Sequence, residues 1–435
     1  MRFGLDFGTS NTTLALEREG VVSVLPLDPD AGTTMPTVLY VRRDGTAIVG
    51  RAAIDAFLSD NAARGPVTRE FKLLGVQMRS SDNKQQSMVE AHIYTDLASP
   101  GRFFQSLKTF LGDPLLQPTN VFGDAKGLQD LIAIILERVR HRAHELAGIL
   151  PEEVTLGRPV EFVGGPEAEA RAVARLEEAA RLAGFRSVRF ELEPVAAARA
   201  AEVPQGHAIV FDFGGGTLDL CVTRRAGDRI EVLATAGADI GGDRMTQLVI
   251  DETIAPRLGA DAEWGPKRLV LPRFVTNAIG DWRALSALNE RWLLDALDDL
   301  IRAGAPRREL SALRSAIELQ LGYEIFAAAD ATKCELSSLP STLLSFHRGE
   351  VDVDALMTRR RFEVRIEPML ERVRALLDTV VRRAGLAHAD IGEVVCTGGS
   401  SAIPSARALL ARTFPSATVR DADLYRSVAA GLAVS

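Results

Sequence analysis

Two glycine-containing segments of similar sequence carry the residues best suited to bind a phosphate. They read DFGTSN at residues 6–11 and DFGGGTLD at residues 212–219. Each follows an apolar run and leads into alternating residues, which predicts a strand, a tight turn and a returning strand. Glycines expose consecutive backbone N–H groups and tolerate positive φ, so such a turn can wrap an anion closely. Asp6 and Asp212 stand where the first strand ends, from where a carboxylate can hold Mg²⁺ through its water ligands.

The repetition of this strand–turn–strand motif is more informative than either copy alone. Glycine-rich hairpins are common, so one copy alone is weak evidence. Two matched copies about two hundred residues apart indicate a duplicated fold that clamps a nucleotide between its halves.

Composition and charge narrow the class of protein. Of the 435 residues, 46% are apolar and 25% charged, which is typical of a soluble globular protein with about two to four domains or subdomains. The net charge of −7 argues against a nucleic-acid-binding surface. No apolar stretch reaches the roughly 18 residues of a membrane span, and no signal peptide precedes the first strand. The 3 isolated cysteines fit a reducing compartment, so we predict a cytoplasmic protein that binds neither membrane nor nucleic acid.

Strand and helix patterns alternate twice along the chain, and each half is interrupted by an insertion, which predicts an α/β protein with two lobes. In the first half we expect strands at 36–41, 154–156 and 188–192, helices at 127–147, 166–184 and 195–201, and an exposed loop at 80–87 within a polar stretch from about 59 to 101. In the second half we expect a mostly helical unit at 251–338, strands at 341–347 and 394–397, a helix from Pro368 to Gly385, and a helix near Pro404.

These patterns suggest boundaries for the two lobes. Lobe I is expected at 1–205 with an inserted subdomain at about 31–126, and lobe II at 206–420 with a helical insert at about 246–338. The C-terminal helix, residues 421–435, is expected to return to lobe I.

Five motifs in order give the chain a family resemblance: DFGTSN, LKTFLG, LEPVAAA, DFGGGTLD and CTGGSSAIP. The chain resembles the ATPase domain of the DnaK-type, seventy-kilodalton heat-shock chaperones of the actin–sugar kinase superfamily. The resemblance implies an actin-like ATPase fold, with two lobes each built on a duplicated ribonuclease H-like α/β core carrying inserted subdomains. Because the sequence ends at Ser435 without a hydrophobic linker, we expect no peptide-binding domain, as in the short YegD-like branch of the family.

The resemblance also implies roles for individual residues. Lys108 would contact the phosphates, with Lys72 as a rival match; Glu193 would orient water or metal; and Asp212 and Thr217 would complete the catalytic set, with Asp219 a further match. Asp6 and Asp212 would hold Mg²⁺. A cation near the γ-phosphate is what phosphoryl transfer requires, because the reaction depends on positioning and on stabilising charge on oxygen.

The remaining matched positions would bind the nucleotide: Gly8, Thr9, Ser10, Asn11, Gly214, Gly215, Gly216, Thr217, Gly241, Gly242, Asp330, Lys333, Ser337, Gly398, Gly399 and Ser400. The sequence departs from the family pattern at several of them. Asn11 replaces an aromatic residue and Asp330 a glutamate. Cys334 and Ala402 replace basic residues that stack on adenine, so we expect weaker nucleotide binding or a looser preference for adenine.

The favoured function is that of an ATP-binding, slowly ATP-hydrolysing protein, whose nucleotide state opens and closes the lobes to regulate a protein partner that the sequence does not identify. The cofactors would be ATP or ADP and Mg²⁺, with K⁺ as a further candidate ion. A small-molecule, sugar-type kinase of the same superfamily is the main alternative, and an actin-like filament or enzyme-reactivating factor is another.

Overall fold

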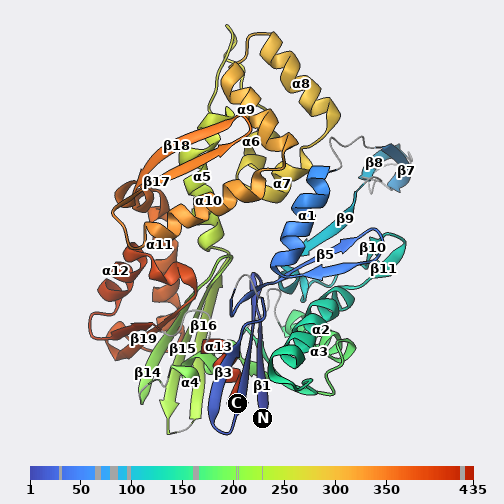
Figure 1. Ribbon diagram of the computed structural model, residues 1–435. Helices are drawn as coiled ribbons and strands as arrows, with labels where there is room; N and C mark the ends of the chain where they lie inside the picture. Colours follow the sequence, from blue (N-terminus) through green and yellow to red (C-terminus); the bar gives the residue numbers. More distant parts are fainter. Residues whose placement is uncertain are drawn as a thin grey trace.

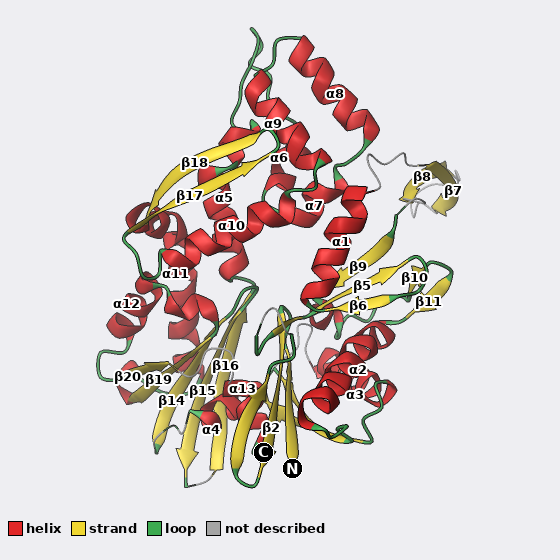
Figure 2. Cartoon of the chain, viewed as in Figure 1, coloured by secondary structure: helices red, strands yellow, loops and turns green. Residues whose placement is uncertain are grey.

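The computed structural model describes residues 1–28, 32–63, 70–78, 87–95, 99–159, 166–201, 203, 205–227, 229–421 and 427–435. Its main feature is a pair of lobes, each built on a twisted sheet, that stand side by side with a further layer of inserted elements above each sheet (Figure 1). Figure 2 shows that the insertion of lobe II is mainly helical.

The sheet of lobe I has the strand order β13-β12-β1-β2-β3. Strands β1 (Arg2–Phe7), β2 (Asn11–Arg18) and β3 (Val21–Leu25) form an antiparallel meander, to which β4 (Met35–Pro36) adds a short pairing. Strands β12 (Glu153–Arg158) and β13 (Ser187–Leu192) then add in parallel to β1. Helices α2 (Leu128–Ala147) and α3 (Pro166–Leu182) complete the lobe I core.

The sheet of lobe II repeats this order as β20-β19-β14-β15-β16. Strands β14 (Gly206–Phe213), β15 (Leu218–Ala226) and β16 (Arg229–Ala238) are antiparallel, and β19 (Ile391–Thr397) and β20 (Thr418–Asp421) are parallel to β14. Helices α11 (Arg359–Arg383) and α12 (Pro404–Thr413) belong to its core. The two sheets have the same order and directions, so the duplicated α/β core is confirmed.

The two repeats exchange their last helices. Helix α4 (Glu193–Ala200) follows the lobe I sheet, but its Ala197 and Ala198 pack with Val210 of lobe II. Helix α13 (Ser427–Ala433) follows the lobe II sheet and packs against β2 of lobe I. Gly431 of α13 touches the backbone of α4 so closely that a Cβ there would collide with it, and this contact joins the lobes at their base.

The insertions lie between core strands. That of lobe I contains β5 (Val38–Arg42), β6 (Ala47–Val49), α1 (Arg51–Ala63), β7 (Glu70–Met78), β8 (Ser87–Thr95), β9 (Gly101–Gln105), a 3₁₀ turn at Leu107–Phe110, β10 (Thr119–Val121) and β11 (Asp124–Lys126). That of lobe II contains α5 (Gly242–Thr253), α6 (Arg273–Ile279), α7 (Trp282–Ala287), α8 (Arg291–Arg302), α9 (Arg307–Glu318), α10 (Gly322–Glu335), β17 (Ser341–Arg348) and β18 (Val351–Thr358).

Two local expectations, for Pro368 and for the start of the C-terminal helix, were wrong, and a third lies mostly outside the described residues. Pro368 does not open a helix but lies inside α11, which begins at Arg359 after the Thr358 hydroxyl caps its first turn. The apolar residues of α11 recur at helical spacing on both sides of Pro368, and their burial outweighs the lost backbone hydrogen bond. The stretch from 59 to 101 contains the end of α1 and strands β7 and β8, while most of the expected loop at 80–87 lies outside the described residues. Asp421 belongs to β20, and α13 begins only at Ser427.

Candidate nucleotide-binding cleft

The first phosphate turn joins β1 to β2. It is closed by a hydrogen bond of 2.9 Å from the Gly8 amide to the Asn11 carbonyl. The Thr37 amide donates to the Ser10 carbonyl at 2.8 Å, which fixes the outer side of the turn. A Cβ added at Gly8 would collide with the Asn11 carbonyl oxygen, so only glycine fits this position.

The second turn joins β14 to β15 in the same way. The Gly214 amide donates to the Thr217 carbonyl at 3.0 Å, which makes Thr217 the equivalent of Asn11. The amides of Gly242 and Asp243, at the start of α5, donate to the carbonyls of Gly214 and Gly215 at 3.0 and 2.8 Å. The N-terminus of α5 is therefore fixed against the turn, and the positive end of the helix dipole favours an anion there.

The structure corrects the reason given for the glycines of these turns. No residue of either turn has φ in the left-handed region, so positive φ is not what requires glycine there. Space requires glycine at Gly8, and it is tight at Gly215, where an added Cβ would lie 3.1 Å from Asp243; an added Cβ at Gly216 would meet no atom within 4 Å. Outside the two turns, a Cβ at Gly241 would collide with the Gly215 carbonyl, and Gly398 combines a φ of 74° with a close approach to Phe213.

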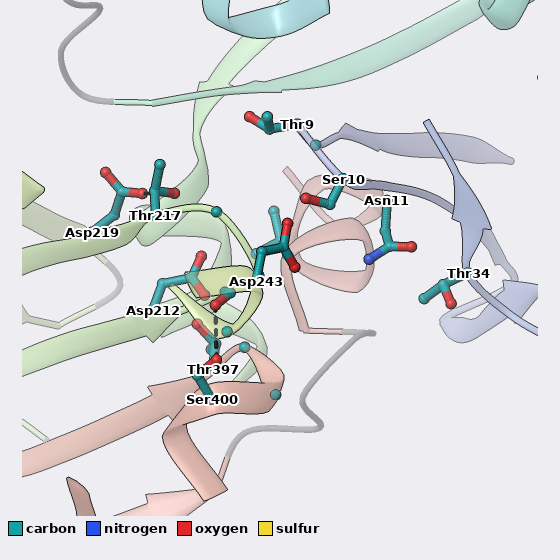
Figure 3. A pocket seen from close by; sticks show the side chains of 18 of the residues that line it. Thr9, Ser10, Asn11, Thr34, Asp212, Thr217, Asp219, Asp243, Thr397 and Ser400 are labelled. Atoms are coloured by element: carbon teal, nitrogen blue, oxygen red, sulfur yellow. Dashed lines mark hydrogen bonds between the residues drawn. The ribbon is translucent and has the colours of Figure 1, made fainter. Parts of the chain in front are cut away.

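The two turns face each other across a cleft of about 480 Å³ (Figure 3). A Cβ added at Gly215 would lie 3.6 Å from the Ser10 hydroxyl oxygen of the opposite lobe. The structure brings all the sequence-predicted site residues to this cleft except Gly241, whose backbone lies close against Gly215 and Gly216. Pro159, which the resemblance matches to a switch proline of the family, also lines the cleft. The lining residues that the sequence did not identify are Thr13, Thr34, Thr109, Asp243, Thr397, Ile403 and Val428.

Lys108 lies at the base of the cleft and is paired with Glu193. Its ammonium nitrogen lies 2.6 Å from the Glu193 carboxylate, and the lysine is 8% exposed. Burial acts to lower the pKa of Lys108, but the carboxylates of Glu193 and Asp6 raise it above its ordinary value, so the ammonium stays charged. The rival Lys72 belongs to β7, whose side chains lie outside the described part of the structure.

The carboxylates around Lys108 outnumber the cations. Burial first, and the Glu193 charge second, raise the pKa of Asp6 to about 7. Burial and then the Asp219 charge raise the pKa of Asp212 to about 7. Burial also raises the pKa of Asp219, although the Thr217 hydroxyl donates to it at 2.9 Å. This concentration of buried acid favours a bound cation.

The donor set fits Mg²⁺ held mainly by phosphate and water. Within the described residues, no three side chains of His, Cys, Asp or Glu are grouped so as to enclose a metal ion. Mg²⁺ commonly keeps several waters and takes one or two carboxylates together with substrate phosphates. Asp6 and Asp212, at the ends of matching strands, are suited to such a site.

Helix α10 lines the cleft with Asp330, Lys333 and Cys334. The Lys333 ammonium lies 2.5 Å from the Asp330 carboxylate and 3.0 Å from the Thr246 hydroxyl, and Thr246 donates to Asp330 at 2.8 Å. Asp330 and Lys333 share a helix face, as their spacing predicts, and together they join α10 to α5. Ser400 donates to the Gly214 carbonyl at 2.9 Å, which joins the CTGGSS segment to the second phosphate turn.

Sequence reasoning missed some of these residues for different reasons. Asp243 directly follows the Gly241-Gly242 pair, so its neighbours gave a signal. Thr397 directly precedes Gly398, and its position at a strand end could have indicated it. Thr34 lies in an irregular segment and gave no signal.

Aromatic side chains join the two insertions above the cleft. Trp282 of α7 packs edge-on against Phe57 of α1 and Phe103 of β9, with ring centroids 5.8 and 5.3 Å apart. Arg51 of α1 donates to the Tyr323 hydroxyl of α10 at 2.6 Å. Figure 1 shows α1 and α7 side by side at this point. The lobes are thus in contact both at their base and above the cleft.

Comparison with known proteins agrees with this architecture. The chain is 28% identical over 435 residues to "Chaperone protein HscA" of Pectobacterium carotovorum subsp. carotovorum strain PC1, covering 99% of this chain and 57% of that protein. It is 27% identical to "Chaperone protein HscA homolog" of Acidithiobacillus ferrooxidans strain ATCC 53993, covering 100% of this chain and 58% of the relative. The chain thus spans less than two thirds of the length of these relatives.

Among the helices of the described residues, none combines the length and the apolar character that crossing a bilayer demands.

The family model described as "Hsp70 protein" matches residues 2–263 and 317–435. Apart from Met1, the unmatched residues are 264–316, which fall in the helical insertion of lobe II. The relatives named above do not test the assignment to a short branch, which stays a prediction. Since the matched residues include both phosphate turns, both sheets and the exchanged helices, the chain belongs to the Hsp70 family.

Proposed function

We propose that this protein binds Mg²⁺-ATP between its two phosphate turns and hydrolyses it slowly. Membership of the Hsp70 family supports an ATP-binding, chaperone-like function. The observation that carries the proposal is the placement of Ser10 opposite Gly215 across the cleft. Lys108 lines the same cleft, together with Asp6 and Asp212, whose pKa values are both raised to about 7.

The residues divide into donors and acceptors for the reaction. Amides of the two turns would bind the phosphate oxygens, and the positive end of the α5 dipole would favour their negative charge. The Lys108 ammonium would stabilise negative charge that develops on the transferred group. Asp212, assisted by Glu193, would accept a hydrogen bond from the attacking water, and Asp6 would hold the waters of the metal. Bound Mg²⁺ would supply charge neutralisation between the phosphates.

We propose that nucleotide state changes the separation of the lobes. The turns belong to different lobes, so a γ-phosphate held by both favours closure. Helix α10 carries Tyr323 near its first residue and Lys333 near its last, and therefore connects the contact above the cleft with the nucleotide site. Closure would be read by a protein partner. The same proposal includes the lobe limits given above and a cytoplasmic location. It also includes that the partner is neither a nucleic acid nor a membrane.

A single-turnover assay tests this function. Purified protein is mixed with ATP labelled at the γ-phosphate, with Mg²⁺, and with or without a panel of sugars. Free phosphate released at the same slow rate in both mixtures supports the ATPase. Label recovered as a sugar ester supports the kinase alternative instead, and no turnover with no binding refutes both.

A further inference from the structure

Thr397 is a buried polar residue of the cleft wall to which the proposed function assigns no role. It is the last residue of β19, and the parallel pairing of β14 with β19 places it directly opposite Asp212. It is 2% exposed and lines the cleft. Figure 3 shows it beside Asp212 at the edge of the cavity.

The hydroxyl of Thr397 lacks the partner that its neighbours have. Ser400 donates to the Gly214 carbonyl at 2.9 Å and Ser401 to the Gly398 carbonyl at 2.7 Å. The Thr397 oxygen is buried and makes no well-formed hydrogen bond within the described residues. A buried hydroxyl without a partner destabilises a fold, so its retention here points to a partner that a small side-chain movement supplies.

Asp212 is the acceptor within reach. The Thr397 hydroxyl is close enough to act in the direction of lowering the pKa of Asp212, against the effect of burial. A Cβ added at Gly398 would lie 2.8 Å from a carboxylate oxygen of Asp212, so this carboxylate lies over the backbone that follows Thr397.

The duplication supplies an internal comparison. In lobe I, Leu5 pairs with Leu156 across β1 and β12, and continuing this register places Gly157 opposite Asp6. Asp6 therefore faces a residue with no side chain, whereas Asp212 faces a hydroxyl. Two carboxylates that are equivalent by topology differ in the residue opposite them, which fits different tasks.

We propose that Thr397 is a positioning residue for hydrolysis: its hydroxyl donates to the Asp212 carboxylate and holds it in the orientation that aligns the attacking water. The inference rests on the proposed ATPase function. Thr397 touches neither the nucleotide nor the water in this account and acts only through Asp212.

The kinetic test compares Thr397→Val with Thr397→Ser. Valine keeps the shape and removes the hydroxyl, so kcat should fall about tenfold while KM and the ATP dissociation constant stay unchanged. Serine keeps the hydroxyl and should restore kcat to within about threefold of the unmodified protein. Thr155→Val is the matched control, because Thr155 is a buried threonine of the equivalent strand β12, 3% exposed and away from the cleft, and its kcat should not change. A Thr397→Val protein with unaltered kcat overturns the inference.

A second test needs no nucleotide. If the hydroxyl bonds to Asp212, Thr397→Val should lower Tm in the unmodified background. In an Asp212→Leu background the hydroxyl is left unpaired, and Thr397→Val should raise Tm. The same shift in both backgrounds overturns the inference. Should Asp212→Leu not fold, the valine and serine kinetics decide. An unmodified protein without ATPase activity refutes the proposed function, while the unfolding comparison still decides whether the hydroxyl bonds to Asp212.

Discussion

Replacing Lys108 by alanine tests the phosphate side of the site most sharply. Because the ammonium lies among Asp6, Glu193 and Asp212, its main effect should fall on the transition state, where charge accumulates on the transferred group. Losing one such contact costs about 10²–10³-fold in kcat, or about 2.7–4 kcal/mol. ATP binding should persist, since the turn amides remain. Single-turnover hydrolysis and calorimetric ATP titration measure the two effects separately.

The same substitution should also change stability. The side chains of the Lys108–Glu193 pair are 9% and 21% exposed, and removing one partner of a buried pair costs about 3–5 kcal/mol. Lys108→Met is the matched control for packing, because it keeps the aliphatic stem without the charge. Both variants should lose stability, and Lys108→Ala should lose more.

The pH dependence of this loss has a definite sign. The folded-state pKa of Asp6 is about 7, above its unfolded value, so its contribution to stability is present at low pH and is lost as pH rises through 7. Lys108 acts to lower that pKa, so Lys108→Met should raise it further and continue losing stability above pH 7. The Tm difference between Lys108→Met and the unmodified protein should therefore be larger at pH 8 than at pH 6.

Three results would refute the reasoning on Lys108. Hydrolysis within about threefold of the unmodified rate would show that the ammonium does not act on the transition state. An ATP affinity that falls as far as kcat/KM would assign it to ground-state binding. A large loss in Lys72→Ala with none in Lys108→Ala would transfer the role to the rival lysine.

Further outcomes follow from the same geometry. Gly215→Val should abolish ATP binding in calorimetry, because its Cβ would lie 3.1 Å from Asp243 and 3.6 Å from Ser10 and its branched side chain would fill the space between the turns. Trp282→Leu should speed nucleotide release about 5- to 150-fold in stopped-flow measurements, since it removes two interlobe aromatic contacts of about 0.5–1.5 kcal/mol each. An unchanged rate refutes a role in closure. Mg²⁺-ATP should raise Tm, and chelating the metal should remove most of the shift. Because Cys334 and Ala402 replace stacking residues, nanomolar ATP affinity with strong rejection of GTP would contradict the expected loose base preference.

Much of the fold could be predicted because duplication leaves a local pattern. Asp6-Phe7-Gly8 and Asp212-Phe213-Gly214 each end a buried strand, and the same strand order follows in both lobes. Helices with a regular apolar face, such as 127–147, were also predictable. Pro368 was misleading, because a local rule about proline was outweighed by the burial of residues on both sides of it.

Other features depend on contacts that no local pattern encodes. Trp282 and Phe57 are far apart in the sequence and meet only because the insertions lie above the same cleft. The importance of Thr397 appears only when the register of β14 with β19 is known. Positive φ was part of the reason for predicting the glycines of the phosphate turns, and none of them has it; Gly215 is instead constrained by Asp243, which approaches it from the start of α5.

The most direct test of the central claim is a crystal structure with a non-hydrolysable ATP analogue and Mg²⁺. The account predicts a triphosphate held between residues 8–11 and residues 214–217, with the Lys108 ammonium within contact distance of the γ-phosphate. Turns that stand apart and empty, or an analogue bound elsewhere on the molecule, would contradict it.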